Sequence, residues 1–307
     1  MNDDRDIGFI ETMEHRRFGE FCDACERDHY IGLCYGPPGV GKTLSARRYT
    51  RWDKIQAYGV SRSSALLKEV RRSKAVFYTT PVVNSPGKLE REIGKRRDLL
   101  HNVAIVPVRR RTEARMKRLL DRADELRDPK RNPDGYRSKA ALKAEDDFLD
   151  LRNRVMRLSV PDPTTLLVVD EADRLKIGSL EQIRDIFDRG GIGLVLIGMP
   201  GIEKQLARYP QLYSRVGFVH EFHTLDKAET RRLLLDHWRP QQFSLSANAL
   251  GDEEGIAAIL QVTGGNFRLI YRLLTQIVRV LRINDLRRIT APVVEAAREN
   301  LVIGAAA

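Results

Sequence analysis

The residues with the clearest chemical pattern form the stretch GPPGVGKT at positions 36–43. It matches G-x-x-x-x-G-K-[ST], in which glycines let the backbone curve around a phosphate and a following helix start adds partial positive charge. We expect Lys42 to reach the β- and γ-phosphate oxygens and Thr43 to place its hydroxyl on Mg²⁺. The residues expected to contact the nucleotide are Gly36, Pro37, Pro38, Gly39, Val40, Gly41, Lys42, Thr43 and Leu44.

A second chemical pattern is the apolar run LLVV followed by Asp170 and Glu171. A carboxylate at the end of a strand can hold Mg²⁺ through water, which is the role expected for Asp170. Glu171 can orient and deprotonate an attacking water. Two carboxylates could instead act as a glycosidase-type acid and base, but that chemistry needs no phosphate-binding loop. The two patterns together predict an enzyme that hydrolyses ATP with Mg²⁺ as cofactor.

These groups must be positioned by strands and helices, and the hydrophobic pattern predicts both. Short apolar runs separated by helical segments are typical of a parallel sheet covered by helices on both faces, so the predicted fold class is α/β. A helix is predicted over residues 42–50. The predicted strands cover residues 30–35, 74–83, 164–175, 191–201 and 217–225.

The chain of 307 residues fits about two domains. We predict an N-terminal helical segment over residues 1–29, the α/β domain over 30–225, and a small all-α C-terminal domain over 226–307. An excess of chain at about 98–159 is predicted to be a charged helical hairpin inserted in the α/β domain, with a turn at 128–135.

The formal net charge of +11 and the isoelectric point near 9.7 favour an acidic partner. Composition alone does not distinguish nucleic acid from an anionic membrane surface. The N-terminus carries acidic residues and no apolar signal region, and no apolar run approaches the roughly 18 residues of a spanning helix. We therefore expect a cytoplasmic protein with no membrane partner.

Cys22 and Cys25 form a C-x-x-C pattern with His15 and His29 nearby, which admits a zinc or redox interpretation. Cys22 and Cys25 also share a helical face with Phe18, a spacing typical of a buried apolar stripe. We favour the buried stripe and predict no protein-bound metal there.

The order of motifs in this chain resembles that of AAA+ ATPases. The stretches that carry the resemblance are GPPGVGKT, LLVVDEADRL, GLVLIGMPG, LYSRVGFVHEF and TGGNFRLIYRLL. Within AAA+ proteins, VVDEADRL followed by IRDIFDRGGIGLVLIGMPGIEKQL is similar to DNA-transposition regulators of the TnsC, TniB and MuB type. The likeness covers approximately residues 30–282 and excludes the insertion at 98–159.

The resemblance implies roles for three further positions. Arg215, before the fifth strand, would reach the γ-phosphate in a neighbouring subunit, with Arg208 as the reserve candidate. Arg268 would tie the C-terminal helical domain, or lid, to the phosphates. Met199 stands where the family usually has a polar residue that contacts the attacking water, so we expect slow hydrolysis.

The resemblance also implies double-stranded target DNA, a transposase, and self-association into a ring or helical filament. DNA would be contacted by residues that follow the second strand and by the start of the insertion. The candidates are Asn84, Ser85, Lys88, Lys95, Arg96, Arg97, Arg109, Arg110 and Arg111. Charged helices are more often solvated faces, however, and between residues 109 and 157 ten acidic side chains accompany sixteen basic ones, so the insertion could dock a protein instead.

Three functions therefore remain open. The first is an ATPase that assembles on target DNA and recruits or activates a transposase. The second is a helicase loader, which would pair stably with a helicase. The third is a nucleotide-gated signalling or defence switch with little turnover.

Overall fold

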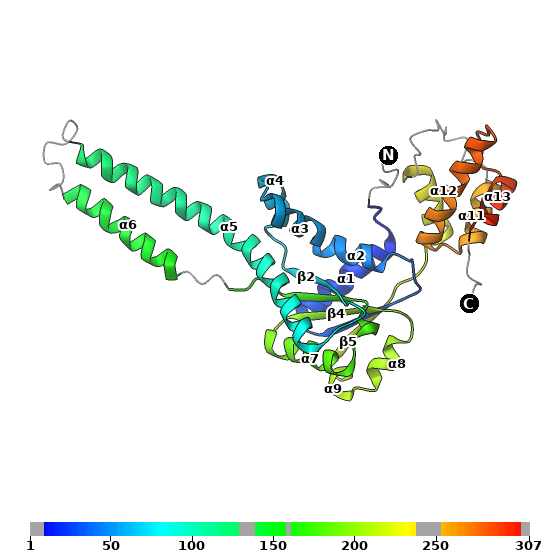
Figure 1. Cartoon of the computed structure of the whole chain (residues 1–307), viewed down its shortest axis with the longest axis horizontal. Coiled ribbons are helices and arrows are strands. Elements are labelled where there is room, and N and C mark those ends of the chain that lie inside the picture. Colours follow the sequence, from blue (N-terminus) through cyan, green and yellow to red (C-terminus); the bar gives the residue numbers. More distant parts are fainter. Residues whose placement is uncertain (1–8, 129–138, 158–160, 238–252, 302–307) are drawn as a thin grey trace. The chain divides into compact units, whose positions relative to one another are not determined.

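The computed structural model describes residues 9–128, 139–157, 161–237 and 253–301. Five strands form one sheet in the order β2-β3-β4-β1-β5, and β1 pairs in parallel with β4 and β5, as β3 does with β4. Figure 1 shows the elements along the chain. The strands are β1 Ile31–Tyr35, β2 Ala75–Thr79, β3 Leu166–Asp170, β4 Gly193–Gly198 and β5 Val216–Glu221.

The parallel register brings the carboxyl ends of the strands to one edge of the sheet. Tyr35 at the end of β1 is opposite Gly198 at the end of β4, and Val169 of β3 is opposite Leu196. Strands β3 and β4 are buried throughout, as expected for central parallel strands. The edge strand β5 instead alternates partly buried and exposed residues, so the expectation of two apolar faces is wrong for this strand.

Helices cover both faces of the sheet. Helix α1 (Met13–Asp28) packs against β1, β3, β4 and β5. The chain crosses the sheet in one direction from β1 to β2 and in the opposite direction from β3 to β5. Because parallel crossovers are right-handed, the helix after β1 lies on the opposite face from the helices after β3 and β4 (Figure 1). These helices are α2 Lys42–Thr50, then α7 Ile177–Gly190, α8 Ile202–Ala207 and α9 Pro210–Tyr213.

All five strands are shorter than predicted, and the ends of β2 and β3 show why. Strand β2 ends at Thr79 instead of residue 83, because Pro81 has no backbone N–H for the ladder. Strand β3 ends at Asp170 instead of residue 175. The next residue, Glu171, has a left-handed backbone with φ 55°, and a short 3₁₀ helix, η2 (Ala172–Arg174), follows it.

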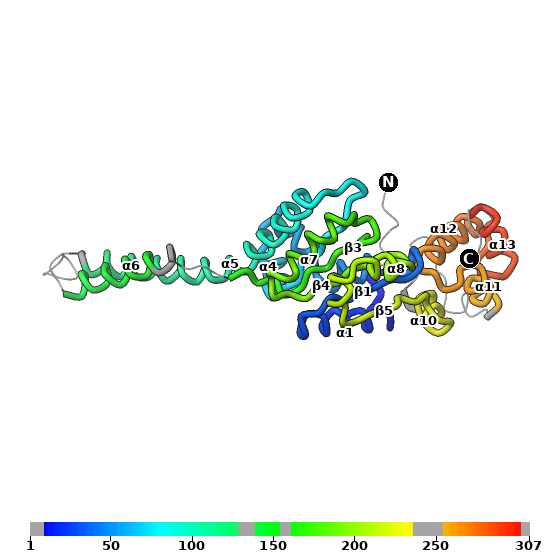
Figure 2. The backbone as a smooth tube through the Cα atoms, turned by 90° about the horizontal axis from the view of Figure 1, so that it is seen from below, coloured from blue at the N-terminus to red at the C-terminus, as the bar shows by residue number. Residues whose placement is uncertain are grey.

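The chain separates into two compact units, and the smaller comprises residues 50–78 and 87–165. It contains the short helices α3 (Trp52–Ser61) and α4 (Ser64–Val70), with α5 (Pro86–Arg127) and α6 (Lys139–Arg157). Helices α5 and α6 run side by side in opposite directions in Figures 1 and 2, which confirms the helical hairpin. The first helix starts at Pro86, however, not near residue 98, and proline suits a first helical position. Most of the turn predicted at 128–135 lies outside the described residues.

The C-terminal part of the larger unit is helical, as predicted. It contains α10 (Lys227–Arg232), a π-helical turn, η3 (Leu233–His237), α11 (Glu253–Thr263), α12 (Phe267–Ile283) and α13 (Ala291–Glu299). On α12, Ile270, Leu273, Leu274, Ile277 and Leu281 form one buried face at helical spacing, and they share a core with α11 and α13. None of the described helices is long and apolar enough to cross a bilayer.

Candidate nucleotide-binding site

The loop between β1 and α2 is a tightly enclosed turn that requires glycine at specific positions. A Cβ atom on Gly36 would lie 2.3 Å from the backbone oxygen of Phe222. Gly39 has φ 85°, and a Cβ there would lie 2.7 Å from the side-chain oxygen of Asn266 and 2.8 Å from the Cβ of Arg268. The backbone therefore keeps its curved path only without side chains at these positions.

Replacing Gly36 with alanine is expected to destabilise the fold by about 1–3 kcal/mol, because the new methyl group meets backbone rather than a movable side chain. Urea unfolding measures this loss, and ATP affinity should fall with it. Gly94→Ala is the control: apart from the neighbouring residues and backbone of α5 itself, no atom lies within 4 Å of the added Cβ, so stability should rise by about 0.5–1 kcal/mol. Equal effects of the two substitutions would contradict the enclosed turn.

Lys42 lies at the start of α2 and points back into this loop. Its side chain is largely buried, and its Nζ donates to the carbonyl oxygens of Gly36 at 2.5 Å and Pro37 at 2.8 Å. Burial lowers the pKa of Lys42. A buried ammonium group whose partners are neutral carbonyl oxygens is stabilised when an anionic ligand binds to it. This position therefore fits a phosphate.

Thr43 and Asp170 meet beside Lys42, although 127 residues separate them. The Thr43 hydroxyl donates to Oδ2 of Asp170 at 2.8 Å, and the backbone N–H of Glu171 donates to Oδ1 at 3.0 Å. Burial raises the pKa of Asp170. These oxygen atoms suit Mg²⁺. Within the described residues, no cluster of three or more His, Cys, Asp or Glu side chains could hold a metal ion.

The phosphate-binding loop is tied to the start of α12. Asn266 caps this helix by accepting from the N–H groups of Arg268 and Leu269, and its Nδ2 donates to the oxygen of Pro38 at 2.8 Å. The N–H of Arg268 donates to the oxygen of Gly39 at 3.0 Å. The predicted residue Arg268 therefore stands at the loop. Asn266 was missed, although an asparagine directly before a helical pattern is a recognisable cap.

Comparison with known proteins agrees with this geometry. A family model described as an AAA domain matches residues 25–206. The chain belongs to the AAA+ ATPase family. Membership supports the predicted ATP binding, and the sheet confirms the predicted fold class.

Individual relatives differ in how much of the chain they match. A "Potential ATP-binding protein" of Staphylococcus aureus is 40% identical over 301 residues, covering 96% of this chain and 97% of that protein. The Mu-like prophage FluMu DNA transposition protein B of Haemophilus influenzae is 30% identical over 127 residues, covering 38% of this chain and 41% of that protein. The structure of Aeropyrum pernix ORC1 protein in complex with DNA matches with a TM-score of 0.50 and 17% identity, over 96% of this chain and 67% of that one, and supports the fold.

Glu171, the predicted base of this AAA+ protein, follows Asp170 in a left-handed conformation that is uncommon outside glycine. Its Oε2 lies 3.5 Å from Nη2 of Arg174, too far for a strong hydrogen bond. Arg174 also donates to the backbone oxygen of Thr80 at 3.2 Å. Arg174 was not singled out from the sequence, where it is one of many charged residues.

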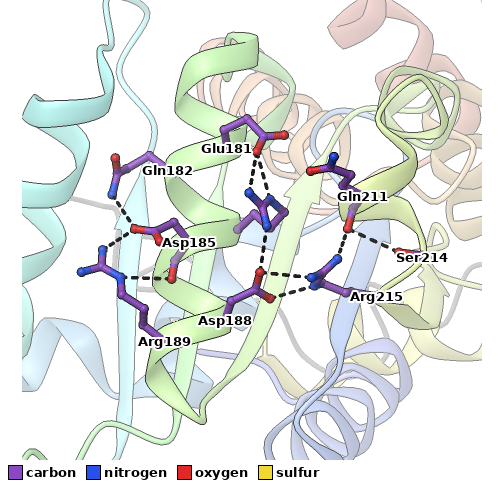
Figure 3. Close-up of polar contacts among 9 residues, drawn as sticks. Glu181, Gln182, Asp185, Asp188, Arg189, Gln211, Ser214 and Arg215 are labelled. Carbon is purple, nitrogen blue, oxygen red and sulfur yellow. Dashed lines mark hydrogen bonds and ion pairs between the residues drawn. The ribbon is translucent and has the colours of Figure 1, made fainter.

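Arg215, the predicted arginine finger, lies between α9 and β5 and is about one-third exposed (35%). Figure 3 shows its guanidinium between Asp188 of α7 and the Gln211 backbone. Its Nε donates to Oδ1 of Asp188 at 2.7 Å, its Nη2 donates to Oδ2 at 3.1 Å, and its Nη1 donates to the oxygen of Gln211. Asp188 was also missed, because no local pattern links α7 to the segment before β5.

Met199 directly follows β4, as expected, and is partly buried. Its backbone N–H lies 3.3 Å from Oδ1 of Asp173, which accepts this contact. A carboxylate of the LLVVDEADRL stretch therefore lies at the end of β4, next to the position where the thioether replaces a polar side chain.

Asn84 has a different environment from the one expected of a DNA contact. It is buried, its Nδ2 donates to the oxygens of Pro81 at 3.2 Å and Arg174 at 2.9 Å, and its Oδ1 accepts from the Ser179 hydroxyl at 2.7 Å. The amide is thus used inside the fold. We therefore do not propose Asn84 as a DNA contact.

The other candidate DNA contacts are either partly buried beside acidic partners, as Arg96 and Arg97 are, or exposed. Arg96 bonds to Glu92 and lies over the Tyr78 ring, and Arg97 bonds to Asp162 at 2.7 Å. Lys95 is exposed and pairs with Glu92 at 3.3 Å. The remaining exposed candidates are Ser85, Lys88, Arg109, Arg110 and Arg111.

The three cysteines, Cys22, Cys25 and Cys34, are buried free thiols. Burial raises the pKa of Cys25 to about 12 and that of Cys22 well above its usual value. Phe18, Cys22 and Cys25 are all fully buried on α1, as expected for the buried apolar stripe.

Proposed function

We propose that this chain is an ATPase that self-associates on double-stranded DNA and, in its ATP-bound form, recruits or activates a transposase. The main support for ATPase activity is that Lys42, Thr43 and Asp170 lie close together at the carboxyl edge of the sheet. A buried cation, a hydroxyl and a carboxylate there match a triphosphate with its Mg²⁺.

In this proposal, different residues of the chain have separate roles in ATP hydrolysis. Lys42 binds the β- and γ-phosphate oxygens, while the Thr43 hydroxyl and the Asp170 carboxylate hold Mg²⁺. The metal, when bound, neutralises charge on the phosphate oxygens. Glu171 orients a water and accepts its proton, and its weak contact with Arg174 leaves the carboxylate available for that role.

Self-association is proposed because Arg215 lies outside its own chain's nucleotide site, between α9 and β5. An arginine that is one-third exposed at this position can reach a phosphate of a second copy. Repeated head-to-tail contacts of this kind build a ring or a helical filament.

Double-stranded DNA is proposed as the partner because of the net charge of +11 and the exposed basic residues of α5. Lys88, Lys95 and Arg109–Arg111 would contact phosphates without reading bases, and Arg96 and Arg97 would join them only by leaving their acidic partners. The transposase is proposed from the partial likeness to the prophage transposition protein B.

The test is ATP turnover with and without double-stranded DNA, at about 50 and about 200 mM salt. Binding through six or more phosphate contacts should weaken by roughly 10³ across that range, so stimulation should appear at low salt and vanish at high salt. The Glu171→Gln variant is the control that excludes a contaminating ATPase. Turnover that DNA does not change would contradict the proposal.

Met199 favours one alternative, a nucleotide-gated switch with little turnover. A thioether does not orient water as a polar side chain does, so such a switch would hydrolyse ATP slowly with or without DNA. The same experiment separates the two functions, because only the first predicts stimulation that salt removes.

A further inference from the structure

The contact between Asp188 and Arg215 is bidentate and joins two separate elements of the larger unit. Two parallel N–H···O contacts, from Nε at 2.7 Å and from Nη2 at 3.1 Å, hold one edge of the guanidinium against the carboxylate. Paired contacts of this kind fix the plane of the arginine as well as its position. The Gln211 oxygen holds Nη1 from its own side (Figure 3).

Some N–H groups of the Arg215 guanidinium make no contact within the described chain. A guanidinium carries five N–H groups, and the contacts within the described chain use three of them. The two that remain belong to Nη1 and Nη2. Guanidinium N–H groups of this kind bind phosphate oxygens.

Asp188 is itself held in place. Its Oδ2 accepts from Nη1 of Arg184 at 2.9 Å, and Arg184 also bonds to Glu181 at 2.9 Å, one turn earlier on α7. Leu180, Ile183 and Ile186 anchor this helix in the core. The carboxylate is therefore a fixed support, whereas a free arginine side chain would sample many rotamers.

We propose that Asp188 is the positioning residue for Arg215, orienting its two remaining N–H groups toward phosphate oxygens of ATP bound to a second copy of the chain. This role rests on the proposed function, in which Arg215 acts between subunits. Asp188 contacts neither ATP nor water in the reaction and acts only through Arg215.

The first test compares Asp188→Asn with Asp185→Asn, under conditions in which the chain assembles. Asp185 lies one turn earlier on α7 and pairs with Arg189 instead of Arg215, which makes it a matched control. Misplacement of the finger should lower kcat about 10- to 100-fold in Asp188→Asn with KM for ATP unchanged, and Asp188→Glu should restore part of the loss. Asp185→Asn should keep both constants. A raised KM with unchanged kcat, or equal losses in both asparagine variants, would overturn the role.

A mixing experiment separates this role from the proposed function. Arg215→Ala subunits keep an intact hydrolysis site, and Glu171→Gln subunits keep an intact finger, so their mixture should hydrolyse ATP if the finger acts between subunits. Adding Asp188→Asn to the Glu171→Gln subunits should then lower the turnover of the mixture about 10-fold or more. An inactive first mixture would refute the finger, whereas two equally active mixtures would refute only the role of Asp188. Sedimentation of each mixture checks equal assembly. Where Asp188→Asn assembles poorly, Asp188→Ala takes its place with the same two outcomes.

Discussion

Arg215→Ala is expected to lower ATP turnover by about 10³- to 10⁵-fold while ATP affinity stays within about twofold. The affinity should be kept because the residues proposed to hold the nucleotide, Lys42, Thr43 and Asp170, all lie within one chain. Turnover should fall because, in the proposed role, the arginine neutralises charge that develops on the γ-phosphate in the transition state. Steady-state hydrolysis at saturating ATP measures the loss, and binding of a fluorescent ATP analogue measures the affinity.

Arg189→Ala and Arg208→Ala are the comparisons for this prediction. Arg189 is an exposed arginine of α7 that pairs with Asp185, so its loss should leave turnover unchanged. Arg208 follows α8 and is the reserve candidate for the finger. A large loss in Arg208→Ala with a small loss in Arg215→Ala would move the role to Arg208 and contradict the assignment.

Glu171→Gln is expected to lower turnover by about 10²- to 10⁴-fold, because the amide cannot accept the proton of the attacking water. The substitution keeps the shape of the side chain and removes only its charge and basicity. ATP should remain bound, so assembly on DNA should persist for longer than in the unmodified chain. Single-turnover hydrolysis measures the chemical step, and sedimentation with DNA measures the persistence of the assembly.

Glu20→Gln controls for the loss of one carboxylate, since Glu20 is exposed on α1. Its turnover should equal that of the unmodified chain. Unchanged single-turnover hydrolysis in Glu171→Gln would show that another group accepts the proton. Loss of ATP binding in the same variant would show that Glu171 supports the nucleotide rather than the water.

Several features could be predicted from sequence because they depend on neighbouring residues. The loop at 36–43 is recognisable because its glycines, lysine and threonine act through one continuous backbone turn. The central strands are recognisable because burial on both faces demands unbroken apolar runs, as in LLVV before Asp170. Helix α12 is recognisable because its buried residues recur at helical spacing.

Element ends were predicted less well, because they depend on local breaks that the hydrophobic pattern does not show. The apolar residues Val82 and Val83 extended the predicted second strand, yet both are largely exposed after β2 has ended. The start of α5 was predicted twelve residues too late. Leu89, Ile93 and Leu100 recur at helical spacing and are buried, but many charged residues lie between them and the prediction did not use this periodicity.

By itself, the amino-acid sequence determined the family-type fold, the phosphate-binding loop, and the carboxylates that follow β3, since each is encoded in a short continuous pattern. Only the tertiary structure decided the partners of these groups. Asn84 meets Arg174 across 90 residues, Asn266 meets Pro38 across 228, and Arg215 meets Asp188 across 27. Such contacts arise because parallel strands and packed helices bring distant segments together, at the carboxyl ends of the strands for the first two contacts and at the amino ends for Arg215. No local spacing encodes which polar side chains then face each other.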